Sequence, residues 1–114
     1  MSQADTVFFE ATDPRGRTIT CTEGCWYGHI LADRSWMSKY KDEVIAAIEK
    51  PDYGVFQDAQ YPDRQVYYRR QGTKARYVKV VVDFSNEESG KVVTAFFTDS
   101  MKSGEKWIWP QSSV

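Results

Sequence analysis

Residues 76–84 read Arg-Tyr-Val-Lys-Val-Val-Val-Asp-Phe, and the rest of the fold is predicted outward from this stretch. Its β-branched, alternating character is typical of a strand rather than a helix. One face is wholly apolar and consists of Val78, Val80, Val82 and Phe84. The other carries Tyr77, Lys79, Val81 and Asp83. The pattern therefore predicts an antiparallel sheet with one buried face and one face available for function.

The flanking runs 65–70 and 91–98 are predicted to pair with this strand, because both are rich in aromatic or β-branched residues. The register that keeps one face apolar matches Val82 with Val93, Val80 with Ala95 and Val78 with Phe97. For the preceding strand, 65–70, the same criterion matches Val66 with Val80 and Tyr68 with Val78. This register places five side chains together on the opposite surface: Tyr67, Arg69, Tyr77, Lys79 and Thr94.

The remaining elements complete an α+β prediction. A short hairpin is expected over 6–22, since Asp-Pro followed by Gly at 13–16 is turn chemistry, and it either extends the sheet or covers its end. An amphipathic helix is expected over 35–50, with Ser35 as its N-cap and Pro51 as its stop. With a strand over 54–58, the predicted architecture is the hairpin and one main helix packed on a four-stranded antiparallel sheet, in a single domain 1–114.

The tail 104–110 contains two tryptophans that flank an isoleucine. This pattern fits an edge strand that finishes the sheet, and it also fits a stacking platform for nucleobases.

Charge is unevenly distributed along the 114 residues, although the net charge is only -1. Residues 1–63 hold six Lys/Arg and eleven Asp/Glu, whereas 64–114 hold nine and five. The span 64–82 holds six basic residues and no acidic one, namely Arg64, Arg69, Arg70, Lys74, Arg76 and Lys79. Such a run indicates either a solvated sheet face or a patch that contacts phosphates.

The cysteine content and the N-terminus restrict the class of protein. Cys21 and Cys25, with one histidine in the chain, do not supply four zinc ligands, so we expect free thiols and no metal or other cofactor. Residues 1–5 lack the basic start and apolar core of a signal peptide, and no run reaches membrane-spanning length. These features predict a cytoplasmic protein that does not insert into a membrane.

The only histidine, His29, lies in a stretch of 23–32 for which a short helical turn is predicted around 26–31. A histidine between apolar neighbours is often a packed structural residue. Histidine is also the side chain whose unperturbed pKa, about 6.5, suits proton transfer near neutral pH.

The order of the motifs His29-Ile30, Arg34, 50–52 (Lys-Pro-Asp), 67–69 (Tyr-Tyr-Arg), 77–82 and 92–96 resembles the phage-associated nuclease branch of the barnase–EndoU–colicin–RelE-like superfamily. The resemblance covers about 26–108 and leaves the hairpin 6–22 outside. It implies a four-stranded antiparallel sheet whose open face cleaves RNA without metal. By position, it implies catalytic roles for His29, Lys79 and Thr94. Such families often have histidine after the arginine, where this chain has Ser35.

The resulting hypothesis is a metal-independent, toxin-like or phage-derived endoribonuclease that cleaves RNA by attack of the 2′-hydroxyl. The expected roles are acid–base catalysis by His29, a phosphate contact by Thr94, charge stabilisation by Lys79, and substrate binding by Arg34, Tyr67, Arg69 and Tyr77. The alternative is a non-catalytic domain of the same fold that binds RNA or a protein. That alternative includes an inhibitor or immunity-type partner, for which the acidic half would be the contact surface.

Overall fold

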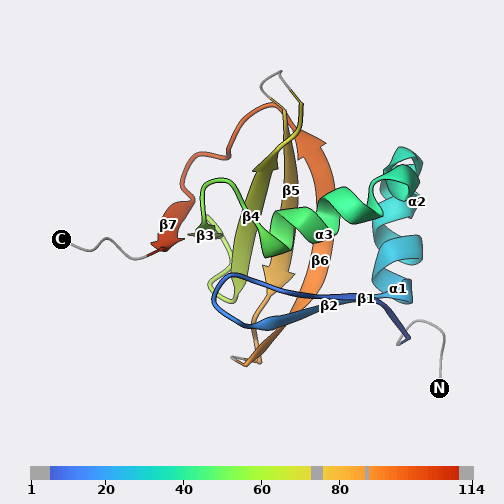
Figure 1. The fold of residues 1–114 in the computed structure, drawn as a ribbon, viewed down its shortest axis with the longest axis horizontal. Helices are drawn as coiled ribbons and strands as arrows, with labels where there is room; N and C mark the ends of the chain where they lie inside the picture. The colour runs from blue at the N-terminus through green and yellow to red at the C-terminus, as the bar shows by residue number, and fades with distance from the viewer. Residues whose placement is uncertain (1–5, 73–75, 87, 111–114) are drawn as a thin grey trace.

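Within the described residues, which are 6–72, 76–86 and 88–110, the computed structural model contains one seven-stranded sheet (Figure 1). Its strand order is β1-β2-β6-β5-β4-β3-β7. The strands are β1 (Val7–Thr12), β2 (Thr18–Thr22), β3 (Val55–Gln57), β4 (Arg64–Arg70), β5 (Tyr77–Asp83), β6 (Ser89–Thr98) and β7 (Lys106–Trp109). Neighbouring strands are antiparallel except β2 and β6, which are parallel.

The predicted four-stranded antiparallel sheet with one main helix is therefore wrong. The hairpin β1–β2 forms around the predicted turn and adds two strands beyond β6. At the opposite edge β7 pairs with β3, so the tryptophan-containing tail is an edge strand. The parallel β2–β6 contact joins segments far apart in sequence, and no local pattern in either segment encodes it.

The helical part consists of short segments rather than one helix over 35–50. They are α1 (Glu23–Cys25), a π-helical turn η2 (Trp26–Ile30), α2 (Leu31–Asp33), a 3₁₀ turn η3 (Ser35–Lys39) and α3 (Lys41–Glu49). Ser35 is not an N-cap; it is the first residue of η3, whose N-cap position is Arg34.

The chain leaves helical geometry at Tyr40, where φ is -117° and ψ is 24°. At this break the rings of Trp36 and Tyr40 both pack on Phe97, with centroid distances of 5.3 and 4.7 Å. Aromatic packing against β6 thus accompanies the interruption. The far end agrees with the prediction, since α3 stops at Glu49, just ahead of Lys50 and Pro51.

The main core lies between the sheet and α3, which crosses one face of β4, β5 and β6 (Figure 1). The buried residues of α3 are Val44, Ala47 and Ile48. Val44 and Ile48 belong to the apolar face predicted for the helix over 35–50, and Ala47 lies next to it. They belong to the main hydrophobic cluster, which also contains residues of β1, β2, β4, β5, β6 and the helical segments. Its members include Phe9, Ile19, Trp26, Ile30, Met37, Tyr67, Val78, Val80, Val82 and Ala95. The valine face of β5 is thus buried, as predicted.

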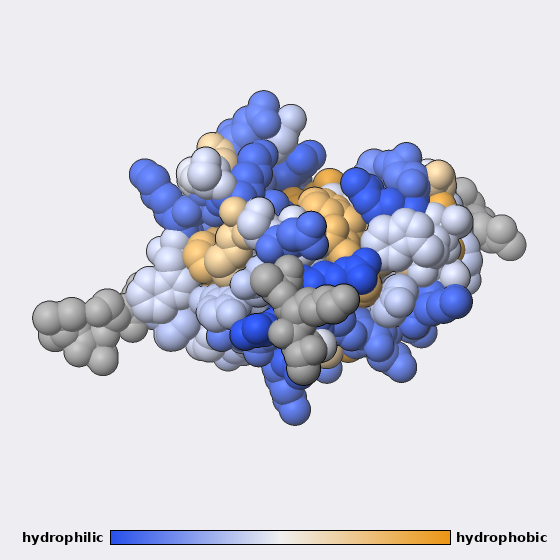
Figure 2. Space-filling model, turned by 90° about the horizontal axis from the view of Figure 1, so that it is seen from above, coloured by the Kyte–Doolittle hydropathy of each residue, from blue (hydrophilic) through white to orange (hydrophobic). Residues whose placement is uncertain are grey.

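A smaller apolar cluster lies on the opposite side of the sheet. It consists of Val66, Tyr68 and Val81, with Phe56, Tyr77, Val93 and Met101 packed around them. Seen from above, at the end of the sheet where β4 leads into β5, hydrophobic residues are exposed between hydrophilic ones (Figure 2). Both faces of the sheet therefore carry apolar side chains, but only one is covered by a helix.

Among the described residues, none of the helices has the length and apolar character needed to cross a bilayer. The expectation about a signal peptide falls on residues 1–5, and Lys74 of the basic run falls on 73–75; both lie outside the described residues.

Candidate functional site

The candidate functional surface is the face of β4, β5 and β6 turned away from α3, and we call it the open face. Its side chains include Val66, Tyr68, Tyr77, Lys79, Val81, Thr94 and Phe96. The β5–β6 pairing agrees with the prediction up to Val81, which lies opposite Thr94, while Lys79 lies opposite Phe96. A bulge then places Val82 opposite Val92 instead of Val93. Lys79 and Thr94 share the open face, as predicted.

The predicted pairing of β4 with β5 is wrong by one residue. Tyr67, rather than Val66, lies opposite Val80. Because side chains alternate along a strand, this slip moves Tyr67 and Arg69 to the face that packs on α3. The two residues were predicted to bind substrate beside Lys79, and the observed register separates them from it.

Tyr67 instead holds the β1–β2 turn against β4. Its hydroxyl donates to Asp13 Oδ2 at 2.8 Å and accepts from Arg15 Nη2 at 3.1 Å. Burial and the negative charge of Asp13 raise the pKa of Tyr67, so the phenol stays a hydrogen-bond donor. Arg69 is also used locally: its Nη1 donates to the backbone oxygen of Lys50 at 2.7 Å, beside the end of α3.

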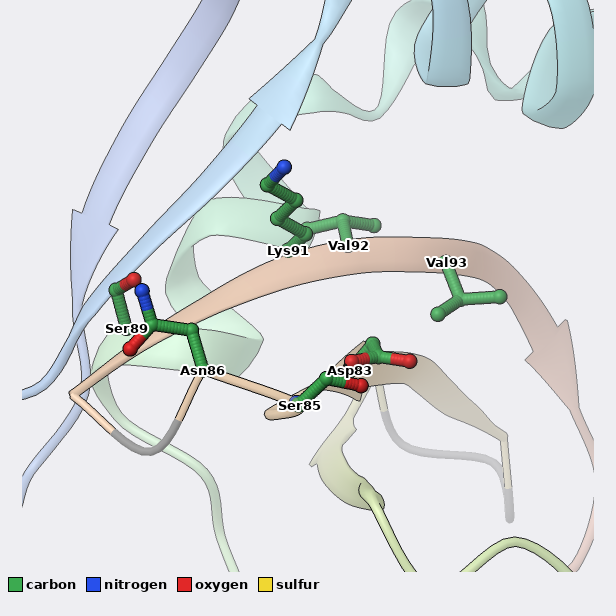
Figure 3. Close-up of a pocket in the computed structure, with 7 residues that line it drawn as sticks. All are labelled: Asp83, Ser85, Asn86, Ser89, Lys91, Val92 and Val93. Atoms are coloured by element: carbon green, nitrogen blue, oxygen red, sulfur yellow. Dashed lines mark hydrogen bonds between the residues drawn. The ribbon is translucent and has the colours of Figure 1, made fainter.

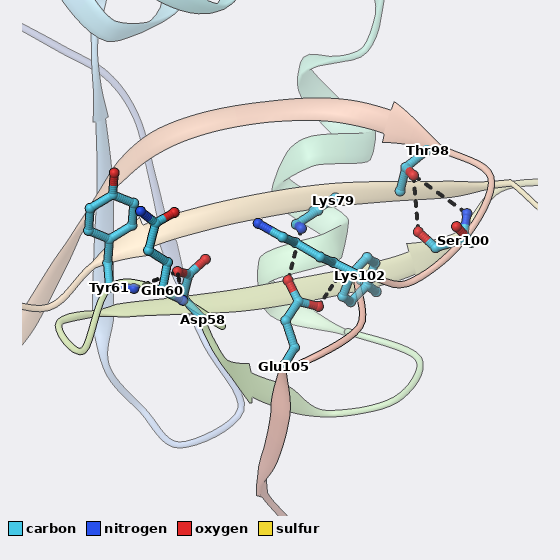
Figure 4. Close-up of polar contacts among 9 residues, drawn as sticks. Asp58, Gln60, Tyr61, Lys79, Thr98, Ser100, Lys102 and Glu105 are labelled. Atoms are coloured by element: carbon cyan, nitrogen blue, oxygen red, sulfur yellow. Dashed lines mark hydrogen bonds and ion pairs between the residues drawn. The ribbon is translucent and has the colours of Figure 1, made fainter.

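The centre of the open face is a buried group of three polar side chains, of which Figure 4 labels Lys79 and Glu105. Lys79 Nζ donates to Glu105 Oε2 at 2.9 Å, and the Tyr68 hydroxyl donates to Glu105 Oε1 at 2.6 Å. The side chains of Lys79 and Glu105 are only 8% and 2% exposed. Burial and the hydrogen bond to Glu105 raise the pKa of Tyr68, which keeps this phenol protonated as well.

The sequence did not identify Tyr68 and Glu105 as site residues. Tyr68 was placed on the wrong face because the β4 register slipped by one. Glu105 follows Lys79 by 26 positions and lies outside any strand or helix, so no spacing rule connects the two. Tyr68 would have been found only if alternate residues of β4 had been assigned to the opposite faces of the sheet, which places Tyr68 beside Lys79.

Arg34 adds a second cation at the β6 side of the open face. Its guanidinium lies 4.8 Å from the centre of the Phe96 ring, and Lys79 Nζ lies 5.8 Å from the same ring. Tyr77 lies on the open face as predicted, half-buried, with its ring 6.1 Å from that of Tyr68. The structure thus gathers four predicted site residues on or beside one face: Arg34, Tyr77, Lys79 and Thr94.

His29 is exposed on η2, a segment packed beside β6. The neighbouring Cys25 fixes this region, because its thiol donates to the backbone oxygen of Val92 at 3.1 Å. Over the part of the chain that the structure describes, no hydrogen bond joins His29 to Lys79 or Thr94. The imidazole of His29 is therefore open to solvent.

A pocket of about 450 Å³ lies at the β5–β6 turn, beside Val93 of the small cluster (Figure 3). Its lining combines the apolar side chains of Val92 and Val93 with the polar groups of Asp83, Ser85, Asn86, Ser89 and Lys91. Hydrogen bonds from the Ser85 side chain and backbone lower the pKa of Asp83, so this carboxyl is ionised at neutral pH. The pocket offers both an apolar wall and hydrogen-bonding groups to a small ligand.

The two cysteines are free thiols. The hydrogen bond with Cys21 lowers the pKa of Cys25, although burial acts in the opposite direction. The same hydrogen bond and burial both raise the pKa of Cys21. In the residues described, no three His, Cys, Asp or Glu side chains converge in a way that would hold a metal ion.

Comparison with known proteins adds no family assignment. No protein-family model, no curated protein and no solved structure matches this chain.

Proposed function

We propose that the chain is a metal-independent endoribonuclease that acts at the open face. The observation that supports this proposal is the position of Lys79 and Thr94 on neighbouring strands of one face, with Arg34 at its side. An ammonium, a hydroxyl and a guanidinium within one patch suit a phosphodiester, because each donates to anionic oxygens and two carry positive charge.

The proposed reaction begins with the 2′-hydroxyl of a ribose attacking the adjacent phosphorus. A base removes the hydroxyl proton as the new P–O2′ bond forms, and an acid gives a proton to the 5′-oxygen as the P–O5′ bond breaks. His29 is the proposed base, since its exposed imidazole lies in η2 next to β6, and a water molecule supplies the proton to the leaving 5′-oxygen. The products are a 2′,3′-cyclic phosphate and a free 5′-hydroxyl. Lys79 and Thr94 stabilise charge that develops on the phosphate.

The test is incubation of a mixed tRNA and rRNA substrate with purified protein in EDTA. We expect cleavage that leaves cyclic phosphate ends. His29→Ala should lower the rate by about 10²–10⁴-fold, the usual contribution of a general acid or base. Thr94→Val keeps the shape and removes the hydroxyl, and Thr20→Val makes the same change on β2, a strand outside the open face that pairs with β6 at Lys91. Only the first of this pair should slow cleavage.

Intact RNA in EDTA would refute the nuclease proposal. So would cleavage that is unchanged in both His29→Ala and Thr94→Val.

A specific observation favours a second candidate, a domain that binds RNA or a protein without cutting. Lys79 is already neutralised by Glu105, and His29 makes no described contact with the cluster. For a binder, the logarithm of the RNA binding constant would fall linearly with the logarithm of salt concentration, and the RNA would stay intact. The same incubation, followed by a binding titration at several salt concentrations, separates the two candidates.

A further inference from the structure

The connection from β6 to β7 lies against the open face, and we call its residues 99–105 the strap. It has no regular secondary structure apart from turns. Met101 packs on the small apolar cluster, Glu105 bonds to Lys79, and the backbone N–H of Lys102 donates to the Tyr68 hydroxyl at 3.2 Å. Figure 4 shows Lys79 and Glu105 pointing toward each other, with the chain of the strap beside them. The strap therefore covers Lys79, one of the residues on which the proposed function depends, and Tyr68 beside it.

Glu105 presents one negative charge and two oxygens to two donors. Lys79 Nζ binds one oxygen and the Tyr68 hydroxyl binds the other. The two non-bridging oxygens of a phosphodiester also share a single negative charge and accept hydrogen bonds from the same kinds of donor. We propose that Lys79 and Tyr68 form a binding site for an RNA phosphate, and that Glu105 occupies this site until the substrate displaces it.

The exchange is feasible because the buried charge of Lys79 keeps a partner throughout. Removing one member of a buried ion pair is costly, since the other charge is left unpaired. When a phosphate replaces the carboxylate, that cost does not arise. Glu105 moves into water and regains its hydration.

The strap is also lightly attached. Five of its seven residues are exposed, and they are Asp99, Ser100, Lys102, Ser103 and Gly104. Its described anchors are the Met101 side chain, the Glu105 carboxylate, the Lys102 amide and two hydrogen bonds between the Ser100 backbone and the Thr98 hydroxyl. Segments with few buried contacts open at low cost in free energy. The strap thus combines a substrate-like anion with the ability to move away.

This inference rests on the proposed function for the identity of the ligand, and it predicts a self-inhibited enzyme. Its test uses the whole chain and a short 2′-O-methyl oligoribonucleotide, which has phosphates but lacks the attacking hydroxyl. Hydrogen exchange is measured over the strap with and without the oligonucleotide, and with inorganic phosphate as a second arm. We expect the oligonucleotide to speed exchange of the Lys102 amide, because its bond to Tyr68 is lost on displacement. A phosphate arm without effect indicates that neighbouring nucleotides are required, as expected for an RNA site.

The variant test compares Glu105→Gln with Asp99→Asn, a matched loss of charge at an exposed position of the same strap. We expect Glu105→Gln to bind the oligonucleotide about tenfold more tightly and to cleave RNA faster, while Asp99→Asn changes neither. If Glu105→Gln fails to fold, hydrogen exchange on the native chain decides the question. Slower or unchanged exchange of the strap on oligonucleotide binding overturns the inference, as does unchanged affinity in folded Glu105→Gln.

Failure of this inference is distinguishable from failure of the proposed function. Strap opening and tighter binding in Glu105→Gln, with RNA left intact in EDTA, would support the phosphate site and refute the nuclease. Cleavage of RNA with the strap still protected would support the nuclease and refute the displacement of Glu105.

Discussion

Replacing Tyr67 by phenylalanine removes one of two β4 side-chain oxygens that bond to the β1–β2 turn, while keeping the ring in the core; the other is Gln65 Oε1, which accepts from Arg15. The Tyr67 oxygen donates to Asp13 Oδ2 at 2.8 Å, and Asp13 is only 3% exposed. Arg15 holds the same carboxylate through Nε at 2.9 Å. Backbone amides of Arg15 and Arg17 bind its other oxygen. The substitution therefore removes one of several hydrogen bonds to a buried charge, and leaves that charge paired.

A hydrogen bond to a charged group contributes about 1.5–3 kcal/mol to stability. Because Arg15 and two amides still satisfy Asp13, we expect a loss near the lower end, about 1.5–2 kcal/mol. With an m value of about 1.5 kcal/mol per M, the urea midpoint would fall by about 1 M. Equilibrium unfolding followed by tryptophan fluorescence measures this shift. RNA binding and cleavage should be unchanged, because Tyr67 lies on the α3 side of the sheet.

The control is Tyr61→Phe, which removes a hydroxyl from an exposed tyrosine and should leave the midpoint unchanged. A double-mutant cycle with Asp13→Asn should give a coupling energy of at least about 0.5 kcal/mol, as expected for directly bonded groups. If Tyr67→Phe left stability intact and instead weakened RNA binding, the observed β4 register would be refuted. Tyr67 would then belong to the open face, as the sequence first suggested.

Three further predictions concern reactivity, packing and pH. Iodoacetamide should modify Cys25 before Cys21 at neutral pH, because the lowered pKa of Cys25 gives it more thiolate; mass spectrometry showing the reverse order would contradict this. Gly90→Ala should cost about 1–3 kcal/mol, since its Cβ would come within 2.5 Å of a core side chain, whereas Gly28→Ala meets no atom within 4 Å and should not destabilise in the same urea titration. The lowered pKa of Asp83 contributes stability above the ordinary aspartate pKa, about 3.9, and this stability is lost as pH falls through the lowered value. Asp83→Asn should therefore be less stable than the native chain at pH 6 and closer to it at pH 2, and a constant difference would refute the assignment.

The β5–β6 hairpin was predictable because one face of β5 is wholly apolar and the other carries charged residues. Every second residue of β5 from Val78 onward is apolar, and only one parity buries them all. The bulge near Val82 was not predictable, since it depends on how the turn and Gly90 pack against the end of the strand. Gly90 allows close approach there: a Cβ at this position would lie 2.5 Å from Val82.

The tail 104–110 was predicted as an edge strand and is one, but the opposite edge of the sheet was not predictable from local patterns. The hairpin turn at 13–16 is visible in the sequence, but the parallel contact of Ile19 with Gly90 joins residues far apart along the chain. The break at Tyr40 is equally non-local, because it accompanies packing on Phe97 of β6. Such contacts are decided by the assembled core, and a helical or alternating pattern carries no information about them.

The β4 strand shows why the candidate site depends on a long-range contact. Its centre, Val66-Tyr67-Tyr68, is apolar or aromatic at every position, so either parity offers the core an acceptable set of side chains. The hydrogen bond to Asp13, 54 residues away in sequence, favours the register in which Tyr67 faces the core, because it gives the buried phenol a partner. Tyr68 is then directed to Lys79 and Glu105. Because one contact sets both outcomes, Tyr67→Phe should affect stability alone, whereas Tyr68→Phe should also weaken RNA phosphate binding. Equal effects of the two substitutions on binding would show that the two tyrosines do not lie on opposite faces.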